Sequence, residues 1–323
     1  MSSPAVELAL RLAADGRADH AVRTLSAAGD KGDAAALYQL AIWNLVGVEV
    51  PRNLPAARAW LRCAVEIGHV DAALMEVALI ANGSGAPPDW PRALALLRTA
   101  AQNDPLASAH LALVDAMALD QAGGPAAIPA SERLSDSPNV VRFSALLTPA
   151  ECQHIAEIAH GSLEPAVVVD PQTGEMITHP VRTSRGTMIG PTKESLVVRA
   201  INQRIAAASG TSTLQGEPLA VLHYAAGQEY RPHFDGIDGA ANQRIKTALV
   251  YLNQGYLGGE TQFMANGLKI AGRSGDVVIF SNALPDGTLD RAAEHAGLPV
   301  LAGQKWLATR WIRAAPHDPW NPR

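Results

Sequence analysis

Three side chains of this sequence have the types and spacing of a metal site. His233 and Asp235 are one residue apart, and His295 follows sixty residues after Asp235. Side chains at positions i and i+2 of a strand leave the same face, so His233 and Asp235 can point at one ion. Two imidazoles and one carboxylate on one face of a metal leave the opposite face open, as a non-haem Fe(II) oxygenase requires. Zinc also accepts this ligand set, so the ligands by themselves do not define the metal.

A fourth candidate, Lys305, follows ten residues after His295 in a run that is otherwise apolar and aromatic. A lysine at a buried strand position requires an anionic partner. Lys305 is therefore the candidate anchor for an acidic co-substrate. The alternative is a lysine at the start of a strand that faces the solvent.

The His-x-Asp pair is weak evidence when it stands alone, because a strand residue followed by a turn aspartate has the same pattern. The surrounding motifs are more specific, and they follow one another in this order: Tyr224-x-x-Gly227-Gln228-x-Tyr230, Gln243-Arg244-x-x-Thr247, Gly258-Gly259-Glu260-Thr261-x-Phe263, Gly275-Asp276 and Gly303-x-Lys305-Trp306. Together they resemble the prolyl 4-hydroxylase family of 2-oxoglutarate and Fe(II)-dependent dioxygenases. The resemblance covers about residues 137–313.

The resemblance implies roles for further residues. Lys305 matches the position at which the family binds the distal carboxylate of 2-oxoglutarate. Tyr224 and Thr261 match positions that hydrogen-bond the same carboxylate, and a hydroxyl in an apolar barrel needs such a partner. The alternatives are a core aromatic side chain for Tyr224 and a plain strand-forming residue for Thr261.

Three residues are candidates for substrate binding by the same resemblance. Arg182 and Ser184 lie in an Arg-Thr-Ser run that the family places near its peptide-binding groove, and Arg244 matches a position near the substrate pocket. For Arg182 and Ser184 the alternative is an exposed strand edge. For Arg244 the alternative is an ordinary surface arginine after a loop.

The implied reaction uses Fe(II), 2-oxoglutarate and dioxygen, with ascorbate as a further candidate cofactor, and releases succinate and carbon dioxide. Related halogenases replace the carboxylate ligand with a small residue, so the presence of Asp235 favours hydroxylation. The expected substrate is peptidyl-proline, hydroxylated at C4. Two alternatives stay open: hydroxylation of a free amino acid or other small molecule, and a repeat-based scaffold whose oxygenase domain is a sensor or is inactive.

Short strands separated by turn residues follow Glu217 and predict an all-β sandwich or barrel. The resemblance implies that they form a double-stranded β-helix, a jelly roll flanked by helices. Before them, Thr148 is predicted to cap a helix that has Pro149 at its first position and Glu151 at its third. A turn is expected at Asp170–Gly174. The clearest strands are Ala220–Tyr224, Lys246–Leu252, Thr261–Phe263, Val277–Phe280 and Trp306–Arg313.

The first 120 residues are rich in alanine and leucine and repeat with a period of about 36 residues. Gly47 corresponds to Gly83, and Ala36 corresponds to Ala72. A period of this size predicts stacked helical hairpins, each of which buries its apolar face against its neighbour. The pattern resembles Sel1-like repeats, which are related to tetratricopeptide repeats. Such repeats would recruit a protein or peptide substrate through a concave surface, or would only stabilise the oxygenase domain.

These observations predict an α+β multidomain protein. The expected boundaries are residues 1–120 for the helical repeats and 121–138 for a linker rich in Gly, Pro and Ser. Residues 139–316 would form the dioxygenase domain, and residues 317–323 a tail.

Charge and apolar patterning argue against some partners. The net charge of -5 is spread along the chain without a basic stripe, so nucleic acid is not expected to bind. The N-terminus lacks a basic start followed by an uninterrupted apolar run, so no signal peptide and no membrane span are predicted. Cys63 and Cys152 fall in different predicted domains, which favours a reducing compartment and the cytoplasm. The oligomeric state stays open.

Overall fold

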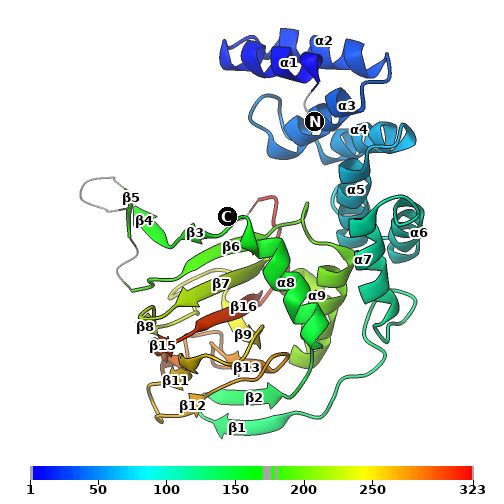
Figure 1. Ribbon diagram of the computed structural model, residues 1–323. Helices are drawn as coiled ribbons and strands as arrows, with labels where there is room; N and C mark the ends of the chain where they lie inside the picture. The colour runs from blue at the N-terminus through cyan, green and yellow to red at the C-terminus, as the bar shows by residue number, and fades with distance from the viewer. Residues whose placement is uncertain (1–2, 170–175, 179–180, 322–323) are drawn as a thin grey trace. The chain divides into compact units, whose positions relative to one another are not determined.

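The computed structural model describes residues 3–169, 176–178 and 181–321 (Figure 1). The chain divides into two compact units. The first comprises Met1–Gly123 and Pro191–Arg199, and the second comprises Gly124–Gly190 and Ala200–Arg323. The turn expected at Asp170–Gly174 lies outside the described residues. Within the described part of the chain, no helix combines the length and the apolar character needed to cross a membrane.

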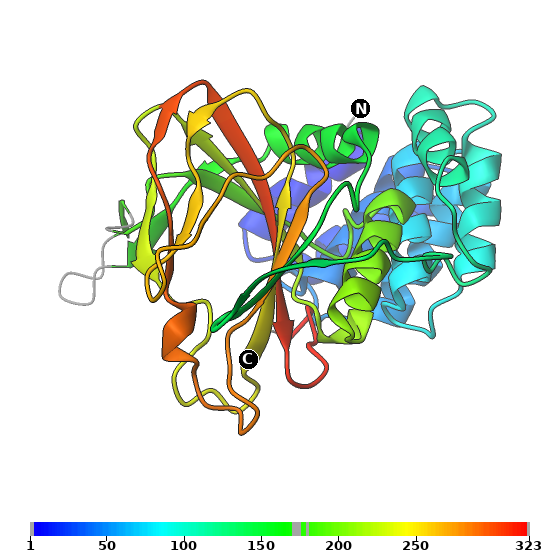
Figure 2. The same cartoon turned by 90° about the horizontal axis from the view of Figure 1, so that it is seen from below.

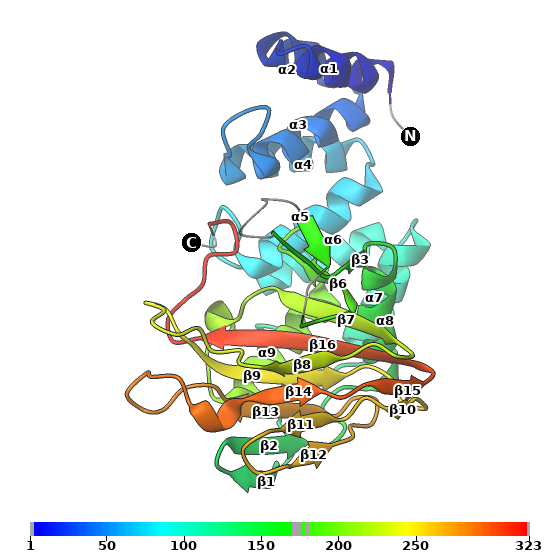
Figure 3. The same cartoon turned by 90° about the vertical axis from the view of Figure 1, so that its left-hand side faces the viewer.

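The N-terminal unit is made of helices that pair in sequence order, which confirms the predicted helical hairpins. Helix α3 lies against α4, and α5 lies against α6 (Figure 3). The helices are α1 (Pro4–Ala14), α2 (Ala18–Gly29), α3 (Ala34–Val46), α4 (Leu54–Glu66), α5 (Val70–Asn82), α6 (Trp90–Ala100) and α7 (Pro105–Asp115).

The period of about 36 residues is visible at the helix ends. Asp33 precedes α3 and His69 precedes α5, and each side chain accepts a hydrogen bond from a backbone N–H of the first turn. Gly47 and Gly83 end the same two helices with φ of 80° and 79°, a left-handed conformation that glycine adopts without steric cost. Alanines at equivalent positions let the helices approach closely, and four of them are 0% exposed: Ala36, Ala57, Ala72 and Ala93.

The second unit is built on two antiparallel sheets that face each other (Figure 2). The larger sheet has the strand order β1-β2-β13-β9-β16-β7-β6-β3, and the smaller has the order β12-β11-β14-β8. Side chains from both sheets, including Tyr251, Phe263, Phe280 and Leu307, form one buried core between them. This arrangement is the predicted jelly roll.

The five strands named from the sequence are all present, with ends shifted by at most two residues. The larger sheet consists of β1 (Glu132–Asp136), β2 (Asn139–Phe143), β3 (Glu164–Pro165), β6 (Arg185–Ile189), β7 (Leu219–Ala225), β9 (Arg244–Tyr251), β13 (Val277–Ser281) and β16 (Gln304–Arg313). The smaller sheet consists of β8 (Tyr230–His233), β11 (Thr261–Phe263), β12 (Lys269–Ile270) and β14 (His295–Gly297). Two-stranded ribbons join β4 (Val167–Val169) to β5 (Met176–Thr178) and β10 (Leu257–Gly258) to β15 (Val300–Ala302).

Helix α8 (Pro149–His160) begins with the predicted capping box. The Thr148 hydroxyl accepts from the Glu151 N–H at 3.2 Å, and the Glu151 carboxylate accepts from the Thr148 N–H at 2.8 Å. The helix packs against β6 and β7. Helix α9 (Leu196–Ser209) contributes Arg204, whose guanidinium pairs with Glu151 at 2.8 Å. Two short 3-10 helices, η1 (Thr213–Gln215) and η2 (Arg291–Ala293), complete the unit.

Two segments differ from the sequence prediction. Glu132–Asp136, expected within the linker, is β1, because its backbone pairs with β2 in a way that a Gly-, Pro- and Ser-rich composition does not reveal. The strand edge given as the alternative for Arg182 and Ser184 is also not found at these positions, because both residues precede β6, which begins at Arg185. Arg182 instead forms an isolated antiparallel bridge with Tyr230.

Candidate active site

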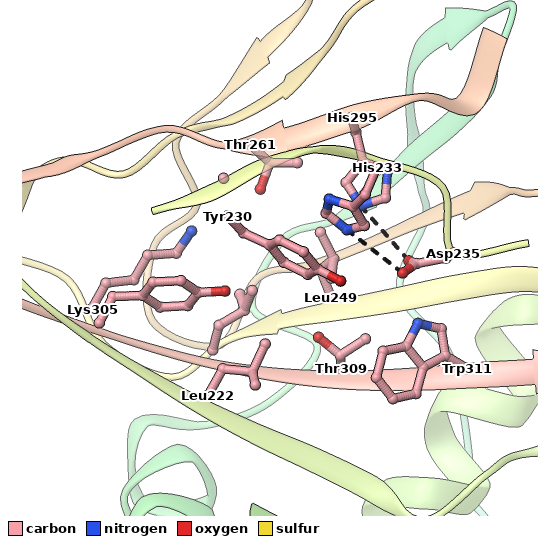
Figure 4. A pocket seen from close by; sticks show the side chains of 13 residues that line it. Leu222, Tyr230, His233, Asp235, Leu249, Thr261, His295, Lys305, Thr309 and Trp311 are labelled. Carbon is pink, nitrogen blue, oxygen red and sulfur yellow. Dashed lines mark ion pairs between the residues drawn. The ribbon is translucent and has the colours of Figure 1, made fainter. Parts of the chain in front are cut away.

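The three candidate metal ligands come together on two neighbouring strands of the smaller sheet. His233 ends β8, His295 begins β14, and the two histidines are Cα partners across the strands. Asp235 lies in the bend just after β8 and turns its carboxylate toward both rings (Figure 4). Nε2 of His233 is 3.8 Å from Asp235 Oδ1, and Nε2 of His295 is 3.7 Å from Asp235 Oδ2. One ligand atom from each residue lies within 4.8 Å of the others.

The orientation of both rings fits a metal ion. Nδ1 of His233 is 2.8 Å from the Arg231 carbonyl oxygen, and Nδ1 of His295 is 3.0 Å from the Ala293 carbonyl oxygen. A carbonyl only accepts, so each Nδ1 carries the proton and each Nε2 keeps its lone pair. Backbone carbonyls commonly orient metal-binding histidines in this way. Both free lone pairs face the Asp235 carboxylate.

The electrostatic environment keeps His233 and Asp235 in the protonation states that bind metal. Burial, helped by the neighbouring His295, lowers the pKa of His233 to about 4. Burial alone would raise the pKa of Asp235, but the opposing influence of His295 and His233 outweighs it, and the net pKa lies below its ordinary value. At neutral pH the site therefore offers a neutral His233 and an ionised Asp235.

Lys305 lies deep in the same unit, on β16, and is 2% exposed. Its Nζ donates to the Gly259 carbonyl oxygen at 2.7 Å and lies 5.6 Å from the ring centres of Tyr224 and Tyr251. Burial lowers the pKa of Lys305 to about 8, against a smaller opposing effect of Glu260. Among the described residues, no carboxylate is close enough to form an ion pair with it. The expected buried lysine is present, and a bound anion would complete its surroundings.

One cavity of about 390 Å³, its mouth included, joins the lysine to the three ligands. Figure 4 shows Lys305 at one end and His233, Asp235 and His295 at the other. Tyr224 and Thr261 also line this cavity. The Thr261 hydroxyl is 3.0 Å from the Tyr251 hydroxyl, and burial raises the pKa of Tyr224 above its ordinary value. Both predicted 2-oxoglutarate contacts are therefore buried and line the same cavity as Lys305.

The three predicted substrate-binding residues are not among the side chains that line the cavity. Arg244 forms a two-pronged ion pair with Glu217, at 2.7 and 2.8 Å, and its guanidinium lies 4.2 Å above the ring centre of Trp311. The Arg182 guanidinium lies 5.5 Å from the ring centre of Tyr230, which does line the cavity. Ser184 is buried next to Tyr224.

Several lining residues were not predicted. On β16 they follow Lys305 at every second position, as Leu307, Thr309 and Trp311. Alternate side chains of a strand share a face. If Lys305 points into the cavity, the sequence therefore predicts that these three residues do so too. Tyr230 belonged to the quoted motif without a role, and its ring stacks on His233 with 3.4 Å between the centres.

A jelly roll whose cavity connects two histidines and a carboxylate to a buried lysine defines a 2-oxoglutarate and Fe(II)-dependent oxygenase. Residues 219–313 match the family model described as the 2OG-Fe(II) oxygenase superfamily. Among curated relatives from Arabidopsis thaliana, probable prolyl 4-hydroxylase 10 is 34% identical over 56% of this chain and 71% of its own length. Probable prolyl 4-hydroxylase 7 is also 34% identical, and the matched region spans 64% of its length. The chain belongs to the prolyl 4-hydroxylase-like members of this superfamily.

Solved structures give more distant likenesses. The viral collagen prolyl hydroxylase of Paramecium Bursaria Chlorella virus-1, in complex with 2-oxoglutarate, is 27% identical with a TM-score of 0.45, over 56% of this chain and 99% of that one. A Sel1 repeat protein from Oxalobacter formigenes is 33% identical with a TM-score of 0.29, over 32% of each chain.

Proposed function

We propose that this dioxygenase hydroxylates peptidyl-proline at C4. The main support is the cavity, which presents a buried cation at one end and a two-histidine, one-carboxylate set at the other. A keto acid with a distal carboxylate, such as 2-oxoglutarate, has anionic groups at both ends and is complementary to this arrangement. Curated relatives at about one-third identity, such as probable prolyl 4-hydroxylases 7 and 10 and prolyl 4-hydroxylase 5, have names that support proline as the substrate side chain.

In this proposal His233, Asp235 and His295 hold Fe(II). Lys305, Tyr224 and Thr261 hold the distal carboxylate of 2-oxoglutarate. The bound metal and co-substrate, with dioxygen, supply the oxidising chemistry that yields succinate, carbon dioxide and a hydroxylated substrate, and ascorbate is a candidate reductant. The chain itself orients the groups and excludes water, because apolar Leu222, Leu249 and Leu307 line the cavity between the two ends, as does the ring of Tyr230.

Arg182, Ser184 and Arg244 remain our candidates for substrate binding, through different contacts. Arg182 lies against Tyr230, and Arg244 lies against Trp311, so both arginines touch a ring that lines the cavity. Glu217 holds Arg244 in that position. Ser184 lies next to Tyr224, so it would affect the binding of the co-substrate through that side chain.

The deciding experiment measures succinate production in air by iron-loaded protein with 2-oxoglutarate. Proline-containing peptides, free L-proline and no substrate are compared. We expect succinate release stimulated by peptide and abolished in His233→Ala. Stimulation by the free amino acid alone would support the small-molecule alternative. An absence of succinate under every condition would contradict the enzyme proposal and favour the scaffold.

A finer proposal concerns the helical repeats, which we suggest recruit an acidic segment of the protein substrate. A groove runs between α4, α5 and α6, with Ile80 and Leu96 among its apolar residues. Arg62, Arg92 and Glu66 supply its exposed charges. The buried Glu76 beneath them pairs with Arg58 at 3.0 Å and with Arg62 at 3.8 Å, so the five charged groups still sum to one positive charge. Its exposed surface is therefore net positive and complementary to an acidic, partly apolar peptide.

If the groove recruits an acidic segment, a substitution in the groove should affect long and short substrates differently. In the full-length chain, Arg92→Glu is expected to raise the KM for a long acidic protein substrate without changing the KM for a short neutral peptide. Arg98→Glu is the matched control, because Arg98 lies on the same helix but does not line the groove. Equal KM values for the long substrate in all variants would leave the repeats with a stabilising role only.

A further inference from the structure

A chain of hydrogen bonds leads from the carboxylate of Asp235 into the larger sheet. Thr247 Oγ1 donates to Asp235 Oδ2 at 2.7 Å, and Asn282 Nδ2 donates to Thr247 Oγ1 at 2.8 Å. The three residues are buried, with exposed fractions of 6%, 0% and 1% for Asp235, Thr247 and Asn282. None of the sequence motifs assigned a role to Thr247 or to Asn282.

The direction of both bonds follows from the chemistry of the groups. An ionised carboxylate only accepts, so Thr247 gives its single hydroxyl proton to Asp235. The Thr247 oxygen is then available only as an acceptor, and Asn282 must offer its amide N–H and not its carbonyl. In this orientation Asn282 Oδ1 is buried and has no hydrogen-bond partner among the described residues. The bond to Thr247 is therefore what selects the amide orientation.

The backbone holds this chain of side chains in place. Thr247 lies on β9 opposite Phe280 of β13, and Asn282 follows directly after β13. The Asn282 N–H donates to the Ile245 carbonyl at 2.8 Å, and the Asn282 carbonyl accepts from the Asp290 N–H at 2.9 Å. Hydrogen bonds of both its N–H and its carbonyl thus fix the backbone of Asn282, from which the side chain reaches Thr247.

We propose that Thr247 and Asn282 are positioning residues for the metal-binding carboxylate of Asp235. With Oδ2 held by Thr247, a rotation that exchanges the two carboxylate oxygens breaks a buried hydrogen bond. Oδ1 therefore stays directed toward Nε2 of His233, 3.8 Å away. The Asn282 N–H polarises the Thr247 hydroxyl and strengthens its bond to the carboxylate. This inference rests on the proposed iron site of His233, Asp235 and His295.

The test measures Co(II) binding to the full-length chain, without turnover, by titration and by the visible absorption bands of the bound ion. Thr247→Val keeps the shape of the side chain and removes the hydroxyl. We expect it to weaken Co(II) binding by about 10- to 100-fold, as loss of a group supporting a metal ligand typically does, and to change the absorption bands. Thr247→Ser, which restores the hydroxyl, should recover both the affinity and the bands.

A matched control separates positioning from general loss of a threonine hydroxyl. Thr187→Val removes a hydroxyl from β6 that bonds Ser162 at 3.3 Å, away from the cavity. It should leave the Co(II) bands unchanged. Unaltered Co(II) affinity in Thr247→Val would overturn the proposal. Failure of the wild-type chain to bind Co(II) would instead contradict the underlying iron site.

Asn282 is tested through a double-mutant cycle. Asn282→Leu alone should weaken Co(II) binding less than Thr247→Val does. Because Asn282 acts through Thr247, the double variant should bind Co(II) as weakly as Thr247→Val and no more weakly. Additive losses in the double variant would show that Asn282 does not act through Thr247. If Thr247→Val does not fold, Asn282→Leu carries the test, and wild-type Co(II) affinity in that variant overturns the proposal.

Discussion

At the scale of single residues, the buried ammonium of Lys305 is the group that most requires a bound anion. Its ammonium is buried without an ion-pair partner among the described side chains, and burial lowers its pKa to about 8. An anion beside Nζ would favour the charged form and raise the pKa again. Binding of 2-oxoglutarate and protonation of Lys305 should therefore be linked.

This linkage predicts a pH dependence of co-substrate binding. Above pH 8 a growing fraction of the ligand-free chain has a neutral Lys305, so the Kd for 2-oxoglutarate should rise, by about tenfold between pH 7 and pH 9. The measurement is calorimetric titration of the Co(II)-loaded chain at both pH values. Lys305→Arg keeps its charge over this range, so its Kd should be nearly flat. An equal rise of the Kd in Lys305→Arg would mean that a different group titrates.

At the scale of elements, one helix cap differs from its equivalents. Helix α3 is capped by Asp33, whereas α5, one repeat later, is capped by His69 through Nδ1, which accepts from the Ala72 N–H at 3.2 Å. Only a neutral imidazole can accept this bond. The His69 ring also stacks on Tyr38, with 4.7 Å between the centres.

The cap of α5 should make the repeat unit sensitive to acid. Burial lowers the pKa of His69 below 6.5, so the unfolded chain binds the proton more readily than the folded chain does. The stability contributed by this group is present above pH 6.5 and is lost as the pH falls below it. Urea unfolding should thus show a larger loss of stability from pH 7 to pH 5 in the wild type than in His69→Asp. Parallel losses in both proteins would rule out this role of the cap.

At the scale of the whole chain, the division into two compact units predicts that a ligand raises the thermal stability of one unit and not of the other. The residues proposed to hold the metal and 2-oxoglutarate all belong to the second unit. At one hundred times the Kd a ligand stabilises the folded state by about 2.7 kcal/mol. Calorimetry with Mn(II) and 2-oxoglutarate should shift one unfolding transition upward and leave the other in place. Asp235→Ala should show no shift, and a joint shift of both transitions would mean that the units unfold together.

Features that depend on neighbours along the chain could be predicted without a structure. The capping box of Thr148 and Glu151 involves backbone groups three residues apart, and the hairpin repeat follows from caps and glycines 36 residues apart, such as Gly47 and Gly83. The buried position of Lys305 followed from its apolar flanks. Such features are local, so residue types and their spacing in the sequence are enough to predict them.

Features that depend on which strands pair required the three-dimensional structure. His233 and His295 face each other only because β8 and β14 are neighbours. The pairing of β9 with β13 brings Asn282 to Thr247, and folding brings Glu217 to Arg244. The sequence motifs already assigned His233 and His295 to one site. The other two contacts join residues more than twenty-five positions apart, and no residue type or spacing near either partner specifies the other. Backbone pairing, which selects among many possible registers by burying the whole core at once, brings them together.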